Sequence, residues 1–429
     1  MTLKSQEFKA AMSAVREQIA TAKRRGSSRG FADYQGCRFI CYSFIDILEN
    51  AGKAAERGEY AFAYSVAALI LVNLAKLAST ADDSAGGITD ARGYVEEVLE
   101  KACSGVEYDS EEAEYIFLQS IKDSQNKAFD GWDEFAYDLL LKTARLATED
   151  NENKMLAAAD ELYGKASDRV YSSWADEYDT LVRLEVIKAT GSEIDVDDYI
   201  KENLKYDTIR RIAVNNAITA SDYARAETLC LEKLQTDSDE PRHEYSKPSE
   251  WRFLLFEVYD KSGDSEKKIR TAEDLLFRFD IKYYAILKHL LTEKGKWDTE
   301  RQPLLTALGN SLPYHLFMKI LSDEGETLWL LEEIRKHPTS VFDYGKQLAA
   351  KYPSQTYALC LDVIRSQAND ADTRVKYKKV CGLIKKLFDF GGVEEVDSII
   401  GELKTKFPRR PAMLEELDAL SGRLAKKRK

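Results

Sequence analysis

The chain has few residues that interrupt regular structure. Its 429 residues include only 8 prolines and 22 glycines. A scarcity of these breakers favours long helices over many short strands joined by turns. The hydrophobic content of 44% and the charged content of 32% are typical of a folded protein. The length predicts two domains or an elongated array rather than one compact core.

The sequence also lacks the motifs of common catalytic and cofactor sites. Its six cysteines contain no CxxC pair, and its four histidines lie far from them in the sequence. The spacing of a zinc site is therefore absent. There is no glycine-rich phosphate loop, no G-x-S-x-G, no H-E-x-x-H and no kinase signature. We therefore expect no metal, no cofactor and no enzymatic activity.

Positive charge is in short supply, because 62 Lys and Arg against 74 Asp and Glu leave a net charge of −12. This balance argues against the whole surface serving as a nucleic-acid platform. Local basic patches still allow contacts with phosphates, although a solvated tail is the simpler explanation of the C-terminal one. These patches are Lys23, Arg24, Arg25 and Arg29; Arg409 and Arg410; and the tail at residues 426–429.

The N-terminus is charged and polar and does not resemble a signal peptide. Cys37 and Cys41 stand four residues apart and read as small core side chains, and unpaired thiols fit a cytoplasmic protein. The long apolar run at residues 61–78 has the length of a membrane span. A helix packed on several sides inside a bundle gives the same pattern, and we expect this second arrangement and no membrane.

Apolar residues recur with helical spacing throughout the chain, and strand-like alternation is missing. In the second half, short breakers separate paired apolar segments at intervals of about 30 to 40 residues, the period of two-helix repeats. The breakers are Ser221-Asp222, Gly263-Asp264, Gly295-Lys296, Glu324-Gly325, Pro353-Ser354 and Gly391-Gly392.

This pattern predicts an all-α protein: a solenoid of helical hairpins similar to tetratricopeptide repeats over residues 201–429, after a less regular helical domain over residues 1–200. Further helices are predicted in the first half at residues 115–121, 132–146, 155–163 and 174–187.

Two blocks of the chain resemble a known family. The segment from Arg29 to Tyr34 (RGFADY) precedes two helices and an Asp82-Asp83-Ser84 loop. Near the other end, a helix from Ala358 (ALCLD) precedes Tyr377-Lys-Lys-Val and a glycine pair. The chain thereby resembles the helical region C-terminal to the zinc finger in bacterial SWIM zinc-finger proteins. The finger itself, a CxC followed by a CxH, is missing, so the resemblance implies a helical scaffold without the finger's zinc or DNA role.

Carboxylates at two places are candidate ligands. Asp82 and Asp83 have oxygens that suit a divalent cation, but aspartates beside Ser and Gly more often form turns and helix caps. Asp90 is predicted to begin the helix that follows. Arg29, Asp33 and Tyr34 are predicted to form a polar cluster at the start of the first long helix, as a ligand site or, more simply, as a salt bridge or cap.

Aromatic side chains are candidate partner contacts. Tyr and Trp are enriched at recognition surfaces because they combine apolar area with a polar group. Tyr283, Tyr284 and Trp297 are predicted either to line a concave groove or to form core, and the same choice applies to Tyr171, Trp174 and Tyr178.

Two functions follow from these patterns. The first is a non-enzymatic scaffold or adaptor that binds a partner peptide or subunit on a concave helical surface. The second is a nucleic-acid-associated accessory factor that uses the local basic patches. The partner and the oligomeric state stay open.

Overall fold

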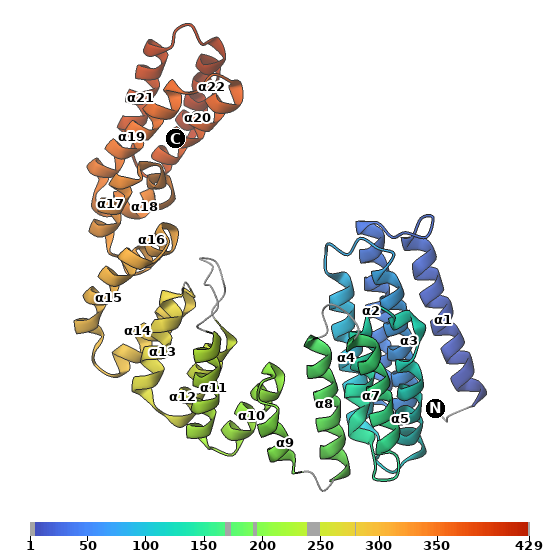
Figure 1. The fold of residues 1–429 in the computed structure, drawn as a ribbon. Helices are drawn as coiled ribbons and strands as arrows, with labels where there is room; N and C mark the ends of the chain where they lie inside the picture. The colour runs from blue at the N-terminus through green and yellow to red at the C-terminus, as the bar shows by residue number, and fades with distance from the viewer. Residues whose placement is uncertain (1–4, 168–172, 192–194, 238–248, 279, 428–429) are drawn as a thin grey trace. The chain divides into compact units, whose positions relative to one another are not determined.

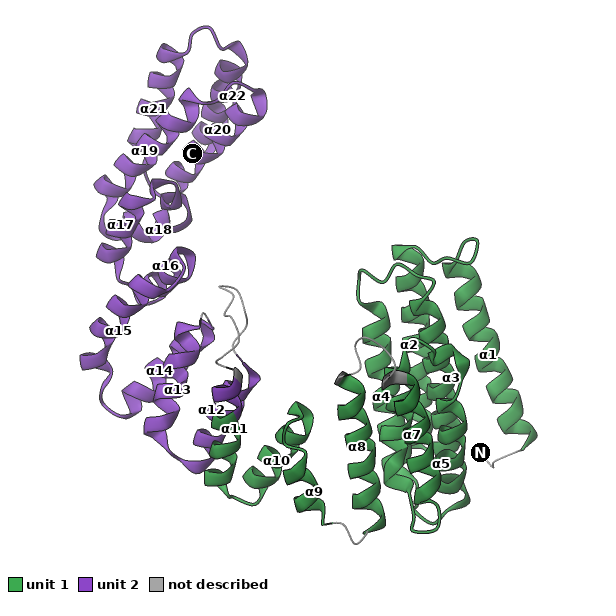
Figure 2. Ribbon diagram, viewed as in Figure 1, with its two compact units in different colours: residues 1–232 green, residues 233–429 purple. Residues whose placement is uncertain are grey.

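The computed structural model describes residues 5–167, 173–191, 195–237, 249–278 and 280–427. These residues form a succession of helices, and extended pairing among them is limited to two isolated bridges (Figure 1). The prediction of an all-α protein is confirmed. The chain divides into two compact units, Met1–Glu232 and Lys233–Lys429, coloured separately in Figure 2.

The first unit is a helical bundle with a short extension. Its elements are α1 (Gln6–Gly26), α2 (Tyr34–Glu56), α3 (Tyr60–Ala78), α4 (Gly87–Gly105), α5 (Glu111–Ser124), η1 (Lys127–Phe129), α6 (Asp133–Thr143), η2 (Ala144–Leu146), α7 (Glu152–Ser167), α8 (Ser173–Thr190), α9 (Val196–Glu202) and α10 (Asp207–Thr219). The four helices predicted between residues 115 and 187 correspond to α5, α6 with η2, α7 and α8.

Helix α3 is the centre of this bundle. It is the apolar run identified in the sequence, and it contacts α1, α2, α4, α5 and α6. Most of its side chains are buried, including Tyr64, Leu71 and Leu74. By length and composition α3 would also pass for a membrane span, but 67% of its apolar window is buried inside the protein. The prediction of a buried core helix is confirmed.

Helix α1 corrects one expectation, because the first long helix begins at Gln6 and not near Tyr34. The Ser5 hydroxyl accepts a hydrogen bond from the Phe8 amide at 3.0 Å and caps the helix. The helix buries Met12, Val15, Ile19 and Ala22, which recur at three- and four-residue intervals. Only these four residues of the helix are buried, and the charged positions between them made their spacing hard to recognise in the sequence.

The second unit is a run of helical hairpins. Its elements are α12 (Glu250–Ser262), α13 (Ser265–Phe277), α14 (Lys282–Glu293), α15 (Trp297–Ser311), α16 (Tyr314–Asp323), α17 (Thr327–Lys336), η3 (Pro338–Ser340), α18 (Val341–Lys351), α19 (Pro353–Asn369), α20 (Arg374–Asp389), α21 (Val393–Lys406) and α22 (Pro411–Lys427). Each helix contacts the next one or two along the chain, which is the contact pattern of a solenoid. One continuous core follows, from Ile269 to Leu424.

The predicted breakers all fall at or beside helix boundaries. Gly263, Gly295, Gly325 and Gly391 have φ between 65° and 103°, a left-handed conformation that glycine adopts without a Cβ penalty. Ser221 adopts φ of 59° at the equivalent position between α10 and α11 (Tyr223–Asp237). Pro353 is the first residue of α19, where the missing amide proton has no helical partner to lose.

The division between the compact units differs from the predicted boundary at residues 200 and 201. That boundary lies inside α9, and both α9 and α10 contact α8. The first unit therefore continues to Glu232, within α11. The break in periodicity near Gly191 marks a turn between packed helices rather than the end of a unit.

A pair of glycines in the second unit gives a test of this packing. A Cβ added at buried Gly345 of α18 would overlap the ring of Phe390, whereas one added at Gly401 of α21 meets no atom within 4 Å. We expect Gly345→Ala to destabilise the protein by about 1–3 kcal/mol. Gly401→Ala is expected to stabilise it by roughly 0.5–1 kcal/mol, because alanine favours the helix. Urea denaturation followed by far-UV circular dichroism measures both, and equal effects would contradict the packing.

Candidate functional site

Two loops meet at one end of the first unit. The loop after α1 and the loop after α3 form an isolated parallel bridge between Ala32 and Ala81. The Ala32 amide donates to the Thr80 carbonyl at 3.0 Å, and the Asp82 amide donates to the Ala32 carbonyl at 2.9 Å. This pairing brings the predicted residues 29–34 and 82–83 to the same end of the bundle, although about 50 residues separate them in the sequence.

The aspartates at this end hold backbone groups in place. Asp33 is the N-cap of α2 and accepts from the Gly36 amide at 2.8 Å. Asp83 accepts from the Ile88 amide at 3.1 Å and from the Cys37 thiol at 3.6 Å. Both carboxylates therefore satisfy amides that a helix start leaves without partners.

Asp82 also accepts local hydrogen bonds, whereas the prediction for Asp90 needs a correction. Asp82 accepts from the amide and the hydroxyl of Ser84 at 3.1 and 2.7 Å, and these hydrogen bonds lower the pKa of its carboxyl group. Asp90 does not begin the helix: α4 starts at Gly87, and Asp90 lies in its first turn. Among the described residues, no three His, Cys, Asp or Glu side chains are grouped to hold a metal ion.

Arg29 and Tyr34 do not form the predicted polar cluster with Asp33. Arg29 is exposed on a turn with φ of 53°, and its side chain makes no hydrogen bond or ion pair within the described part of the chain. Tyr34 is 39% exposed and lies beside Arg38, whose guanidinium carbon is 5.8 Å from the centre of the Tyr34 ring.

Helix α2 carries an unusual exposed surface around Arg38. Phe31, Tyr34, Phe39 and Tyr42 are 52%, 39%, 43% and 58% exposed. With Arg38 they form what we call the α2 aromatic patch. The Arg38 guanidinium carbon is also 5.7 Å from the Tyr42 ring, and its Nη2 donates to the Tyr42 hydroxyl at 3.4 Å. The Tyr34, Arg38 and Tyr42 spacing of four residues was the sequence signal that could have located this face.

A groove runs beside this patch between α1 and α2. It has a volume of about 570 Å³ and is lined by Phe39, Ser43 and Asp46 from α2 and by Gln18 and Arg25 from α1, among others. One edge of the α2 aromatic patch therefore borders a concave surface within the first unit.

Of the two arrangements predicted for the aromatic residues of the second unit, groove lining or core, the structure shows core. Tyr283 and Tyr284 are only 5% and 7% exposed, and Trp297 packs against the core. The Tyr284 and Trp297 rings meet edge to face, with centres 6.2 Å apart. Consecutive hairpins bury one face of α14, and these tyrosines lie on that face. They stabilise the stack of helices and are not available to a partner.

The aromatic residues predicted to line a groove or form core in the first unit also form core. Trp174 and Tyr178 pack on the fully buried Tyr137, with ring centres 6.0 and 5.6 Å from it. Tyr171 lies outside the described residues. This cluster is core between α6 and α8.

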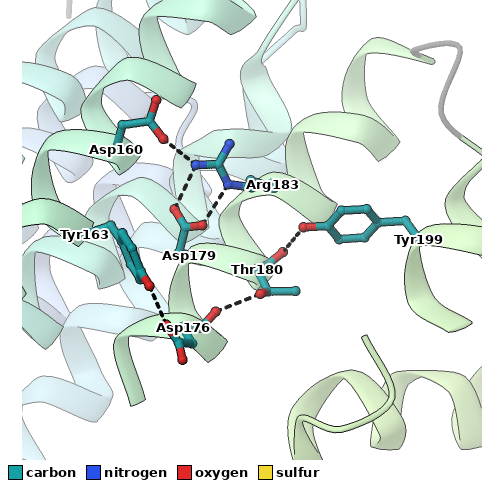
Figure 3. Close-up of polar contacts among 7 residues, drawn as sticks. All are labelled: Asp160, Tyr163, Asp176, Asp179, Thr180, Arg183 and Tyr199. Carbon is teal, nitrogen blue, oxygen red and sulfur yellow. Dashed lines mark hydrogen bonds and ion pairs between the residues drawn. The ribbon is translucent and has the colours of Figure 1, made fainter. Parts of the chain in front are cut away.

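A polar network joins α7, α8 and α9 beside that cluster (Figure 3). Arg183 of α8 donates to Asp179 at 2.7 Å and also pairs with Asp160 of α7. The hydrogen bonds that Arg183 donates to both aspartates raise the pKa of Arg183, so it stays charged. The ion pair between Arg183 of α8 and Asp160 of α7 joins these two helices.

Figure 3 also shows the hydrogen bonds that the Tyr163 and Tyr199 hydroxyls donate. The Tyr163 hydroxyl donates to Asp176 at 2.8 Å, and the Tyr199 hydroxyl of α9 donates to the Thr180 carbonyl at 3.4 Å. Tyr199 thereby ties α9 to the bundle. Each drawn carboxylate has a hydrogen-bond partner, as in a structural network rather than an acid–base pair poised for proton transfer.

A buried ion pair lies between α4 and α6. Arg92 donates from Nε and Nη2 to the two oxygens of Asp138 at 2.6 and 2.7 Å, and the Asp138 side chain is 6% exposed. The guanidinium carbon also lies 5.0 Å from the centre of the Phe135 ring. Burial raises the pKa of Asp138, and Arg92 opposes that shift.

The cysteine thiols are buried and have low nucleophilic reactivity. All six cysteines are unpaired and buried. Burial raises the pKa of Cys37 to about 11 and that of Cys103 to about 12. Because the thiolate is the nucleophilic form, these side chains are poor nucleophiles near neutral pH.

Several cations of the predicted basic patches make contacts within the protein. Lys23 donates to Asn73 at 3.2 Å, and Arg24 pairs with Glu17 of its own helix at 2.7 Å. Arg410 donates to the carbonyls of Ala368 and Ala371 at 2.9 and 2.8 Å. These contacts occupy donors that two of the three patches would otherwise offer to phosphate. Residues 428–429 of the tail lie outside the described part.

The fold and its surfaces define an all-α protein of helical hairpins. No family model matches the chain, and no curated protein matches it. Among solved structures it is similar to a circular tandem repeat protein with novel repeat topology and enhanced subunit contact surfaces. That similarity has 13% identity and a TM-score of 0.17, and it covers 98% of this chain and 99% of the other. A similarity at that level carries no argument about function.

The buried ion pair gives a prediction for the first unit. Arg92→Ala leaves the Asp138 carboxylate buried without its partner, and we expect a loss of about 3–5 kcal/mol. Without Arg92, the burial that raises the pKa of Asp138 is opposed only by the charge of Lys142. The folded form then binds a proton more readily than the unfolded chain, so the loss is expected to grow with rising pH.

Hydrogen exchange of the α4 and α6 amides at pH 5 and pH 8, corrected for the intrinsic exchange rate, measures this loss. Arg24→Ala is the matched control, because Arg24 and Glu17 are 67% and 70% exposed and such pairs contribute at most about 1 kcal/mol. An Arg92→Ala protein as stable as this control would show that the buried pair is not important for the fold.

Proposed function

We propose that this protein is a non-enzymatic scaffold that binds a partner protein through the α2 aromatic patch. The observation that carries the proposal is that Tyr34 and Tyr42 are exposed and lie beside the Arg38 guanidinium, with Phe31 and Phe39 also exposed within three residues of this group along the chain. Tyr, Trp and Arg are the residues that most often dominate the energy of protein interfaces.

The composition of this surface argues for a partner. Four of the large apolar side chains that are exposed in the described residues fall between positions 31 and 42. Single exposed apolar residues need no explanation, but a contiguous group marks an interaction surface. Water must order around these rings when the face is free, and a partner that covers them releases it.

The charge of the patch indicates the partner's chemistry. Arg38 pairs with no carboxylate among the described residues, and its side-chain contacts are the two tyrosine rings and the Tyr42 hydroxyl. A guanidinium held between rings is oriented and presents several donors to a carboxylate. The complementary surface is an Asp or Glu flanked by apolar side chains.

The stacked hairpins support a scaffold role in general, because such arrays present long surfaces relative to their size. The contact surface that we propose is on α2, since the aromatic residues first expected to line a groove in the second unit are core. The finding that bears on the alternative nucleic-acid role is that Lys23 and Arg410 hydrogen-bond to other helices or loops of the protein.

The test begins with a photo-reactive phenylalanine analogue at position 42, which crosslinks whatever covers the patch in lysate of the source organism. The same analogue at position 118 is the control, because Leu118 of α5 is 40% exposed and lies outside the patch. A protein crosslinked from position 42 but not from 118 is then purified for binding measurements.

We expect Tyr42→Ala and Arg38→Ala each to weaken binding of that protein by about 30-fold, the effect of a central interface residue. Leu118→Ala should leave the dissociation constant unchanged within twofold. Calorimetry measures all three, with circular dichroism as the check of folding. Equal affinities for all variants, or crosslinks to nucleic acid alone, would contradict the proposed scaffold role.

A further inference from the structure

A cationic groove opens between α20 and α22 in the second unit. The two helices pack side by side (Figure 1) and enclose a groove of about 520 Å³. This volume falls within the roughly 300–1,000 Å³ of ligand pockets in proteins. Its floor includes Cys381, Leu420 and Leu424, and these three side chains are buried.

The rim of the groove is basic on both sides. Lys378 and Lys385 line it from α20, and Arg423 and Lys427 line it from α22. Lys378 and Lys385 are seven residues apart, so they lie on one face of their helix, and Arg423 and Lys427 are four apart. Gly382 lies between the two lysines, and no atom is within 4 Å of where its Cβ would be. Glycine thus leaves the middle of the groove open.

Part of this charge has no internal carboxylate within ion-pair distance. Lys378 and Lys385 make no ion pair in the part of the chain that the structure describes, although the charge of Lys378 helps to lower the pKa of Glu416. Arg423 donates from Nε to the Ala419 carbonyl of its own helix at 3.2 Å and keeps its remaining donors. Lys427 has one long contact, 3.6 Å to Asp389.

One acidic residue lines the groove, and it is already paired. Glu416 accepts from Arg374 at 2.8 Å, at the end of the groove away from Lys427. The groove therefore has a net positive charge although the whole chain carries −12. A local excess of positive charge attracts anionic ligands.

The residues that line the groove favour an acidic peptide over a nucleic acid as its ligand. Single-stranded nucleic acids bind to grooves that combine basic side chains with aromatic rings on which bases stack. No aromatic residue lines this groove, and its floor is aliphatic and thiol. A helical peptide with one apolar face fits such a floor, and carboxylates at the edges of that face reach the cations on both rims.

We propose that the groove between α20 and α22 binds an acidic amphipathic peptide segment of a partner protein. Apolar side chains of the segment cover Cys381, Leu420 and Leu424, and its Asp and Glu side chains pair with Lys378, Lys385, Arg423 and Lys427. This site is separate from the α2 aromatic patch and belongs to the other unit. It stands or falls independently of the function proposed above.

The probe is a displayed library of random 16-residue peptides, selected on the full-length protein. Two variants carry equal changes of charge. Lys385→Glu with Arg423→Glu reverses the groove, whereas Lys379→Glu with Lys426→Glu reverses two exposed lysines of the same helices that do not line it. We expect enriched peptides to contain excess Asp and Glu and apolar residues at helical spacing.

The strongest enriched peptide is then synthesised, together with a version in which Gln replaces every Glu and Asn every Asp. Fluorescence anisotropy is expected to show at least tenfold weaker binding to the groove variant, unchanged binding to the surface control, and weakening with added salt. The amide version should bind at least tenfold more weakly to the wild type.

Three results would overturn the proposal. The first is equal binding of the acidic and the amide peptides, and the second is equal enrichment on the wild type and the groove variant. The third is an oligonucleotide of the same charge that binds the groove more tightly than the peptide. If the charge reversal unfolds the protein, Lys385→Gln with Arg423→Gln removes the same charges without repulsion and tests the same point.

Discussion

The first unit depends on covering one helix that is apolar over most of its circumference. Helix α3 leaves only Lys76 exposed, and five helices pack around the rest of it. Because the neighbouring helices cover α3, each of them turns its apolar face toward it. Helix α2 buries Cys37, Cys41 and Phe44 toward the core, and the adjoining face, with Tyr34, Arg38 and Tyr42, is left at the surface. The α2 aromatic patch is therefore exposed because of how α2 packs against α3, and its aromatic character comes from the sequence of α2.

In the second unit the constraint is different, because no single helix is central. Each hairpin covers the one before it, and the core continues along the chain. Helices two apart along the chain, such as α20 and α22, come into contact as a result. Their exposed edges form a groove wherever the residues between them are small, as at Gly382. Surface features of this unit therefore arise from helix order rather than from any one helix.

Helical spacing predicted the helices well where the apolar stripe was wide, as in α3 and α5 to α8. Turn positions in the second half were predictable because glycine at positive φ is a local requirement. Helix α1 was missed because a stripe of only four buried residues is hidden by the charged positions around it. The choice between groove and core at Tyr283, Tyr284 and Trp297 could not be made from the sequence, since an aromatic side chain suits a core and an interface equally.

By itself the sequence determined the helices, most of their ends, the buried central segment and the capping role of residues such as Asp33, because these depend on neighbours within a few positions. Only the tertiary structure decided which aromatic residues are exposed and which cations are free. Arg410 and Lys385 have the same charge, yet one is held by backbone carbonyls and the other lines a groove. That difference depends on contacts between helices that are distant in the chain, and no local pattern encodes it.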